Sequence, residues 1–140
     1  MSAGAAGRPG GGKPDAAGLL DTARALLPRA RAPHSRFRVA AALEDEAGEI
    51  HPGVNVESAS FGLTICAERN ALFGALARGA ARFRRIAIAC DPPATCMPCG
   101  ACRQVLLEYA PDLEVIVASA KGPPERIPLR ELYPRPFVDF

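Results

Sequence analysis

The feature that most constrains this chain is a set of three cysteines and one glutamate divided between two short motifs. Cys66-Ala67-Glu68 is the first, and Pro98-Cys99-Gly100-Ala101-Cys102 follows about thirty residues later. Zinc takes sulfur ligands in a tetrahedron, and a catalytic site keeps one of the four positions for water. Three cysteines leave that position open. The pattern therefore indicates a hydrolytic zinc site rather than a structural one, and the two motifs must meet in the fold.

Both motifs are expected at the beginning of a helix. Thr64 is the expected N-cap of a helix over about residues 65–78 that Gly79 ends, and Pro98 suits the entry to a second helix. Unpaired N–H groups at a helix N-terminus favour a thiolate, which is the form of cysteine that binds metal. We therefore expect zinc between two helix starts.

Glu68 has a spacing that makes it a poor fourth ligand, because residues two apart do not face each other in a regular helix. Side chains in the first turn lean toward the N-terminus, so Cys66 can approach a metal while Glu68 reaches past it. Glu68 is then expected to act as a general base that takes a proton from water and delivers it to a substrate nitrogen. Zinc deaminases divide the work in this way.

The flanks of the two motifs carry further recognisable sequence. The blocks are Thr64-Ile65-Cys66-Ala67-Glu68-Arg69-Asn70-Ala71 and Pro98-Cys99-Gly100-Ala101-Cys102-Arg103-Gln104-Val105, with Ser35-Arg36-Phe37-Arg38-Val39, Gly53-Val54-Asn55-Val56-Glu57 and Glu131-Leu132-Tyr133-Pro134 around them. Together they resemble the small cytidine deaminases over roughly residues 16–137. The resemblance implies a three-layer α/β/α fold with a mixed five-stranded sheet. It also implies one Zn²⁺ per subunit, held by Cys66, Cys99 and Cys102, with Glu68 as the catalytic residue.

The resemblance implies an activity and an assembly as well. Members of the family hydrolyse cytidine, and deoxycytidine, to uridine or deoxyuridine and ammonia in pyrimidine salvage. The three-cysteine members are usually homotetramers with active sites shared between subunits. Such a chain binds a small-molecule nucleoside and needs neither nucleic acid nor a membrane.

The resemblance assigns substrate contacts and one supporting residue. The expected substrate contacts are Phe37, Asn55, Glu57, Ala67 and Phe137, the last covering a base bound by a neighbouring subunit, with Phe140 as the fallback. Arg69 is expected to hydrogen-bond the ligand sulfurs and offset their charge. On residue type alone, Phe37 would be core, Asn55-Val56-Glu57 a polar turn, Arg69 a surface ion pair, and the terminal Phe-Val-Asp-Phe segment docked on its own core.

Three positions depart from the family pattern. Phe61 stands where tyrosine is usual, Ser58 where asparagine is common, and Ala40 where glycine is common. The loss of a hydroxyl at Phe61 removes one hydrogen bond from the neighbouring-subunit contact. None of these changes touches the metal ligands or the base.

The rest of the chain alternates helices and strands. Asp15 is expected to cap a helix that stops near Pro28, and two strands over residues 37–43 and 49–54 are joined by a polar turn at 44–48. Further strands are expected at 86–90, 113–118 and 126–129. This order predicts a mixed sheet with helices on its faces.

Composition suits one globular domain. Residues 14–140 are expected to form a single zinc-dependent deaminase domain, and the Gly/Ala-rich residues 1–13 a disordered tail. No secretory h-region or membrane-length apolar stretch is present. Five cysteines, an odd number around a metal motif, favour a reduced cytoplasmic protein.

Three alternatives remain open at this stage. Cys96 could complete a closed four-cysteine structural site. Cys90 is expected to be a thiol packed in the core. A related aminohydrolase that acts on a modified cytosine nucleoside such as blasticidin S shares the zinc motifs, although Glu57 favours cytidine. The third alternative is a nucleic-acid surface lined by arginines at 29, 31, 36 and 38, and at 78, 82, 84 and 85, but a net charge of only +2 favours solvated faces. His34 and His51 are assigned no metal role.

Overall fold

The computed structural model describes residues 13–92 and 95–139. Its elements are α2 (Ala16–Leu26), η2 (Leu27–Arg29), β1 (Val39–Asp45), β2 (Ile50–Val54), η3 (Phe61–Leu63), α3 (Ala67–Ala77), β3 (Phe83–Cys90), α4 (Gly100–Tyr109), β4 (Glu114–Val117), β5 (Glu125–Pro128) and α5 (Leu129–Leu132). All but one residue of the expected tail, and Phe140, lie outside the described part. The expected alternation of elements is confirmed.

The strands form one five-stranded sheet in the order β2-β1-β3-β4-β5. Strands β3 and β4 are parallel, and the other three neighbouring pairs are antiparallel, so the sheet is mixed as predicted. Pro52 lies on β2 at the edge of the sheet, where a residue without an N–H costs no ladder bond on the outer side.

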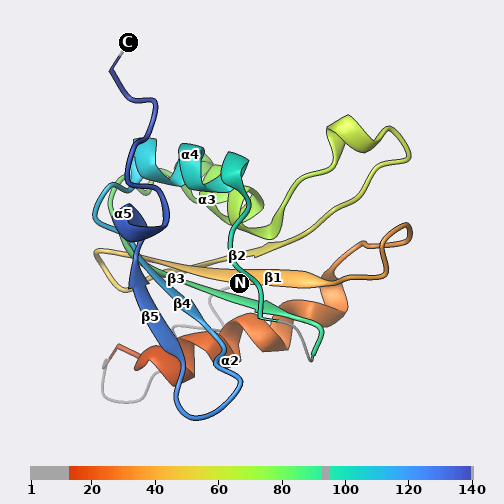
Figure 1. Ribbon diagram of the computed structural model, residues 1–140, viewed down its shortest axis with the longest axis horizontal. Coiled ribbons are helices and arrows are strands. Elements are labelled where there is room, and N and C mark those ends of the chain that lie inside the picture. Colours follow the sequence, from red (N-terminus) through yellow and green to blue (C-terminus); the bar gives the residue numbers. More distant parts are fainter. Residues whose placement is uncertain (1–12, 93–94, 140) are drawn as a thin grey trace.

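The sheet carries helices on both faces, which makes three layers (Figure 1). Helix α2 covers one face, and α3 and α4 cover the other. Successive residues of a strand point to opposite faces. Along β1, Ala41 and Leu43 accordingly pack with α3 and α4, while Ala42 packs with Leu19 and Leu20 of α2. The three-layer α/β/α fold expected from the resemblance is confirmed.

The ends of two helices test the capping predictions. Asp15 caps α2 as expected, because its Oδ1 accepts a 2.8 Å hydrogen bond from Gly18 N. Thr64 as N-cap of α3 was wrong: the N-cap is Cys66, and Thr64 Oγ1 accepts from Ser58 N at 3.0 Å instead. The second metal helix begins in the same way, with Cys99 as N-cap directly after Pro98. Two cysteines of the motif therefore occupy N-cap positions.

Gly53 lets α3 approach the sheet closely. A Cβ at this position of β2 would lie 2.2 Å from Ala67 O and 2.5 Å from Ala71 N. Both of these are backbone atoms of α3, and they cannot give way as a flexible side chain would. The sequence at this position therefore sets the height at which the start of α3, with its half of the metal motif, sits above the sheet.

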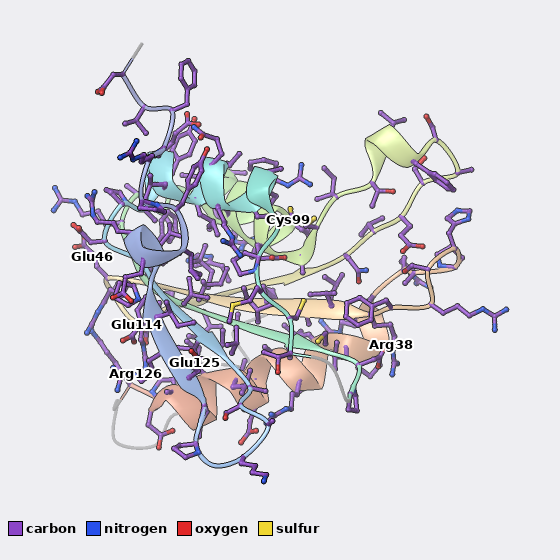
Figure 2. The ribbon with its side chains drawn as sticks, viewed as in Figure 1. Arg38, Glu46, Cys99, Glu114, Glu125 and Arg126 are labelled. Carbon is purple, nitrogen blue, oxygen red and sulfur yellow. The ribbon has the colours of Figure 1, made fainter. Side chains whose placement is uncertain are left out.

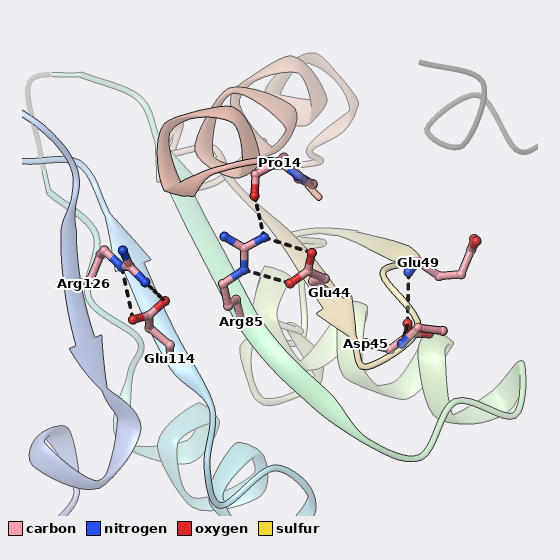
Figure 3. A network of polar contacts seen from close by, with 8 residues as sticks. Pro14, Glu44, Asp45, Glu49, Arg85, Glu114 and Arg126 are labelled. Carbon is pink, nitrogen blue, oxygen red and sulfur yellow. Dashed lines mark hydrogen bonds and ion pairs between the residues drawn. The ribbon is translucent and has the colours of Figure 1, made fainter. Parts of the chain in front are cut away.

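A buried ion pair ties α2 to the sheet. The guanidinium of Arg85 binds both carboxylate oxygens of Glu44 at 2.7 and 2.9 Å and also donates to Pro14 O at 2.7 Å (Figure 3). Glu44 is fully buried, so its prediction as part of a polar turn was wrong. Strand β1 continues through Asp45, because Glu44 finds its cation on β3, the neighbouring strand.

The last residue of β1 is a second buried polar group. Asp45 Oδ2 accepts a 2.9 Å bond from His51 Nε2. Its Oδ1 accepts from the backbone N–H groups of Ala47 and Glu49, and Figure 3 shows the bond from Glu49. Arg78 Nη2 lies 3.0 Å from His51 Nδ1, which makes Nδ1 the acceptor and Nε2 the protonated nitrogen. His51 is therefore a structural link between β2 and the end of α3.

In the part of the chain that the structure describes, no helix combines the length and the apolar character that crossing a membrane requires.

Candidate metal centre and substrate cavity

Three thiols gather where α3 and α4 begin. Cys66 is the N-cap of α3, Cys99 is the N-cap of α4, and Cys102 lies in the first turn of α4. Their sulfur atoms all lie within 4.8 Å of one another. Cys99 is found at the start of α4, on the face of the sheet opposite α2 (Figure 2). Helix starts concentrate unpaired N–H groups, so this is a favourable place for thiolates.

The spacing of the thiols suits zinc. A zinc–sulfur bond of about 2.3 Å places two ligands of a tetrahedral site about 3.8 Å apart. Cys66 Sγ and Cys99 Sγ lie 3.7 Å apart. Soft thiolates favour zinc over the hard cations. The donor set and its spacing therefore fit a zinc ion with one coordination position left for a further ligand.

Arg69 lies against the thiols from the first turn of α3. Its Nη2 donates to Cys66 Sγ at 3.3 Å, and hydrogen bonds to Cys66 and Cys102 raise the pKa of the guanidinium. Its Nε is buried without a hydrogen-bond partner among the described residues. The cation is thus placed to offset negative charge on the sulfurs, which is how the resemblance expects Arg69 to lie.

Contacts within the cluster shift the pKa values of two of its thiols in opposite directions. The hydrogen bond with Cys102, followed by those from Arg69 and Cys99, lowers the pKa of Cys66 to about 5 against the opposing effect of burial. The same shared bond, and then burial, raises the pKa of Cys102. The lowered pKa of Cys66 favours the thiolate, which is the form that binds a metal ion.

Glu68 lies in the first turn of α3 and is only 3% exposed. Burial, with a smaller contribution from the charge of Cys66, raises the pKa of its carboxyl to about 7. Glu68 is not one of the clustered metal-binding residues, and it lines the cavity beside them. A carboxyl with such a pKa can both take and give a proton near neutral pH.

A cavity of about 260 Å³ opens beside the thiols. It is lined by Cys66, Glu68 and Cys99 on the metal side and by residues of the 35–39 and 55–57 segments on the other. Phe37, Asn55, Glu57 and Ala67 are all among the lining residues. The structure therefore brings four of the five expected substrate contacts to one cavity.

Phe37 and Asn55 have an exposure and hydrogen bonds that residue type alone would not predict. Phe37 precedes β1 and is 37% exposed, so it is not a core residue. The buried Asn55 amide donates to Phe37 O at 2.8 Å and accepts from Val39 N at 2.9 Å. Asn55 thus fixes the main chain around Phe37. One N–H and one lone pair of the amide remain beyond these two bonds.

The segment with Asn55 and Glu57 is extended rather than a turn. Val56 bridges to Arg31 on one side and to Ile65 on the other. The side chain of Glu57 turns toward residues 34 and 35, whose N–H groups donate to Oε1 at 2.8 and 3.1 Å. The two bridges of Val56 place residues 55–57, which follow β2, beside Ile65, just before α3.

Phe137 is the expected contact that does not line the cavity of its own chain. Its side chain is 66% exposed, and its carbonyl accepts a 2.6 Å bond from Gln104 Nε2 of α4. Tyr133 donates to Gln104 Oε1 at 2.7 Å. Gln104 therefore links the C-terminal segment to the helix that carries Cys99 and Cys102.

Cys96 stands apart from the metal cluster. Although it lines the cavity, it is not one of the three described residues grouped within reach of a metal. Burial, more than any other cause, raises the pKa of its thiol to about 12. The arrangement therefore argues against a closed four-cysteine site. Cys90 is partly buried against the main core, as a core thiol would be.

Ser35, which contacts both Glu57 and Phe37, was not among the predicted site residues. The side-chain hydroxyl of Ser35 hydrogen-bonds the carboxylate of Glu57, a residue 22 positions away in the chain. Only the pairing of the two segments brings these residues together. The one local signal was the place of Ser35 two residues before Phe37.

An open zinc site of this kind, with a buried proton-transfer group beside it, defines a zinc-dependent hydrolase. Residues 15–119 match the family described as the cytidine and deoxycytidylate deaminase zinc-binding region. The chain belongs to that family.

Relatives and solved structures agree with this assignment. The chain is 44% identical over 107 residues to a cytidine deaminase of Halalkalibacterium halodurans, a match that covers 76% of this chain and 81% of the relative. It superposes on the crystal structure of a cytidine deaminase from Burkholderia pseudomallei with a TM-score of 0.79 and 43% identity, covering 85% and 96% of the two chains. A cytidine deaminase from Mycobacterium tuberculosis gives a TM-score of 0.76 with 35% identity, covering 86% and 94%.

Proposed function

We propose that this protein is a zinc-dependent hydrolase that converts cytidine, and deoxycytidine, to uridine or deoxyuridine and ammonia. The observation that carries the proposal is the position of Glu68, buried in the cavity wall next to three clustered thiols but outside their ligand set. A structural zinc site has no use for such a group.

Cys66, Cys99 and Cys102 would hold the metal, and Arg69 would offset their charge. When bound, zinc supplies a Lewis acid that makes water a competent nucleophile at neutral pH. Glu68 accepts a proton from the attacking water and delivers it to N3 of the cytosine ring. Glu68 then takes the proton of the hydroxyl now on C4 and passes it to the exocyclic nitrogen, so that the C4–N bond breaks as the C4 carbonyl forms and ammonia leaves. Burial of the Glu68 carboxyl disfavours its charged form, which favours its holding a proton between the two transfers.

The other end of the cavity would hold the sugar. We infer that Phe37 packs near the base, that Ala67 contributes to the wall beside it, and that Asn55 and Glu57 bind the ribose hydroxyls. Polar groups that bond a sugar hydroxyl strongly reject substrates that lack it, because those groups are then left unpaired. Of the departures from the family pattern, Phe61 lines a neighbouring pocket together with Ser35 and Glu57, and Ser58 N donates to Thr64 of the cavity wall.

We propose a homotetramer in which Phe137 of one subunit covers the base bound by another. Support comes from the exposed apolar side chains of Phe61, Leu63 and Phe137, which are 74%, 69% and 66% exposed in the single chain. A soluble chain buries such side chains more favourably in an interface than in water. Gln104 would hold the segment that carries Phe137 in place.

We also propose a reducing, cytoplasmic location and a part in pyrimidine salvage. All five cysteines are free thiols, and three of them form the metal cluster, which an oxidising compartment would threaten. Residues 14–140 would form a single deaminase domain.

Turnover of cytidine by the purified, zinc-replete protein, followed by absorbance and by ammonia release, tests the proposed function. We expect activity that a chelator abolishes and that added zinc restores. Blasticidin S is the comparison substrate. Ammonia release from blasticidin S but not from cytidine or deoxycytidine would assign the protein to the related aminohydrolases instead.

A further inference from the structure

The segment before β1 is docked on the segment after β2 at the sugar end of the cavity. Arg31 N donates to Asn55 O, and Glu57 N donates to Arg31 O, both at 2.9 Å. The Asn55 amide then bonds the main chain at Phe37 and Val39. The two segments are therefore held in a fixed register by main-chain and side-chain bonds together.

The chain turns sharply between these anchor points. Arg36 has a φ of 58°, which places a non-glycine residue in the left-handed region. Such a conformation costs about 1 kcal/mol or more and persists only where surrounding contacts impose it. The imposing contacts lie on both sides of Arg36, at Ser35 and at Phe37.

Glu57 receives three hydrogen bonds from this turn. The N–H groups of His34 and Ser35 donate to Oε1 at 2.8 and 3.1 Å, and the Ser35 hydroxyl donates to Oε2. The bond from the Ser35 hydroxyl, supported by the N–H groups of His34 and Ser35, holds the pKa of the Glu57 carboxyl below its usual value. Glu57 is therefore an ionised acceptor at neutral pH.

The Ser35 hydroxyl makes a second contact. Its oxygen accepts a 3.0 Å bond from Phe37 N. One hydroxyl thus touches both Glu57 and the main chain of Phe37, two of the residues expected to contact substrate. Ser35 lines the same cavity as both of them and as Glu68.

We propose that Ser35 is a positioning residue that makes this site selective for nucleosides with a ribose hydroxyl. The inference rests on the proposed function and deepens it. Two N–H donors fill the two lone pairs of Glu57 Oε1, while the Ser35 hydroxyl fills one of the two on Oε2. One acceptor site on Oε2 is left for the substrate. The hydroxyl of Ser35 stops the carboxylate from turning this site away from the cavity.

Ser35 is a suitable residue for a test because it is exposed and adds nothing to the core. Ser35→Ala removes the hydroxyl, and Ser35→Thr keeps it. Thr22→Ala is the matched control, since it removes a hydroxyl that bonds Gly18 O at 3.1 Å on the exposed face of α2. The measurement is kcat and KM for cytidine and for 2′,3′-dideoxycytidine.

We expect Ser35→Ala to raise KM for cytidine about tenfold, the usual weight of one hydrogen bond to a charged group, with kcat changed by less than about twofold. KM for the dideoxy compound should stay near the wild-type value, because that compound has neither a 2′- nor a 3′-hydroxyl to offer Glu57. Ser35→Thr should restore the wild-type ratio of the two KM values, and Thr22→Ala should leave it unchanged.

Two other results would overturn the inference. Equal losses for the two substrates in Ser35→Ala would mean that Ser35 only supports the local fold. An unchanged ratio in an active Ser35→Ala enzyme would mean that Glu57 is oriented without it. Both results leave the proposed function standing, whereas a wild-type protein without activity on cytidine removes the function and this inference together.

Discussion

Arg69 donates a 3.3 Å hydrogen bond from Nη2 to the sulfur of Cys66, the residue that begins helix α3. The contact joins the guanidinium of Arg69, the residue that follows Glu68, to a sulfur of the metal cluster. Three thiolates on Zn²⁺ give a net negative centre, which weakens the pull of the metal on water. A cation in contact with a ligand sulfur offsets this charge without taking a coordination position.

Arg69→Gln should therefore lower cytidine turnover or zinc affinity by about 10- to 100-fold, the range found for groups that support metal ligands. Turnover and zinc content at equilibrium with a chelator measure the two effects. Arg24→Gln is the control, since Arg24 makes only an exposed ion pair with Asp21 on α2. Equal behaviour of the two variants would show that Arg69 has no part in the centre.

Gly53→Ala should disturb the metal centre by pushing on the side of α3 that faces the sheet. The added methyl group would lie 2.2 Å from Ala67 O, so the start of α3 must shift. We expect a loss of about 1–3 kcal/mol in the free energy of unfolding, together with reduced zinc content. Gly62→Ala is the matched control, because nothing lies within 4 Å of a Cβ there. Similar denaturant midpoints for both variants would contradict the packing argument.

Cys96→Ser distinguishes an open site from a closed one. Cys96 lines the cavity but lies outside the metal cluster, so the variant should keep full zinc content and fold normally. Cys102→Ser, by contrast, removes a buried ligand and should lose zinc. Metal analysis of the two purified proteins is the measurement. Loss of zinc and unfolding in Cys96→Ser would restore the four-cysteine structural site.

The buried Asp45 carboxylate should make stability depend on pH in the acid range. Burial opposes its ionisation, but the bond from His51 and those from the Glu49 and Ala47 N–H groups outweigh burial and hold its pKa below the usual value. A lowered pKa gives stability that is complete above the ordinary carboxyl pKa of about 4 and is lost as pH falls through the folded value. Asp45→Asn should flatten this decline.

Unfolding in denaturant between about pH 6 and pH 3 measures the effect. Asp112→Asn is the control, because the side chain of Asp112 is 90% exposed and has only a distant cation, Arg130, at 3.7 Å. If the stability of Asp45→Asn and of Asp112→Asn followed the same pH dependence, the Asp45–His51 contact would not be a source of the stability lost at acid pH.

Much of the fold followed from the local pattern of the sequence. Runs of apolar residues bounded by turn residues located the strands, and Asp15 marked the start of α2, because both signals depend only on neighbours in the chain. The cap of α3 was missed because Thr64 and Cys66 both precede the helix. The choice between them depends on Ser58, whose N–H occupies the Thr64 hydroxyl.

Long-range polar partners were beyond reach of the sequence. Glu44 looks like a turn residue until Arg85, 41 positions later, is placed beside it on β3. His51 is likewise defined by Asp45 and Arg78 together. At the site, the cysteine spacing was informative because metal geometry is strict. The bonds of Asn55 and Glu57 to residues 34–39 required the fold.

The most direct test of the central claim, that Glu68 transfers protons beside a three-thiolate zinc, is the zinc content and cytidine turnover of Glu68→Gln. Glutamine keeps the size of the side chain but cannot carry the proton. The account predicts a protein with one zinc per chain, as in wild type, and turnover reduced by at least about 10²- to 10⁴-fold. Near-wild-type turnover in a zinc-loaded Glu68→Gln enzyme, or loss of zinc in step with activity, would contradict it.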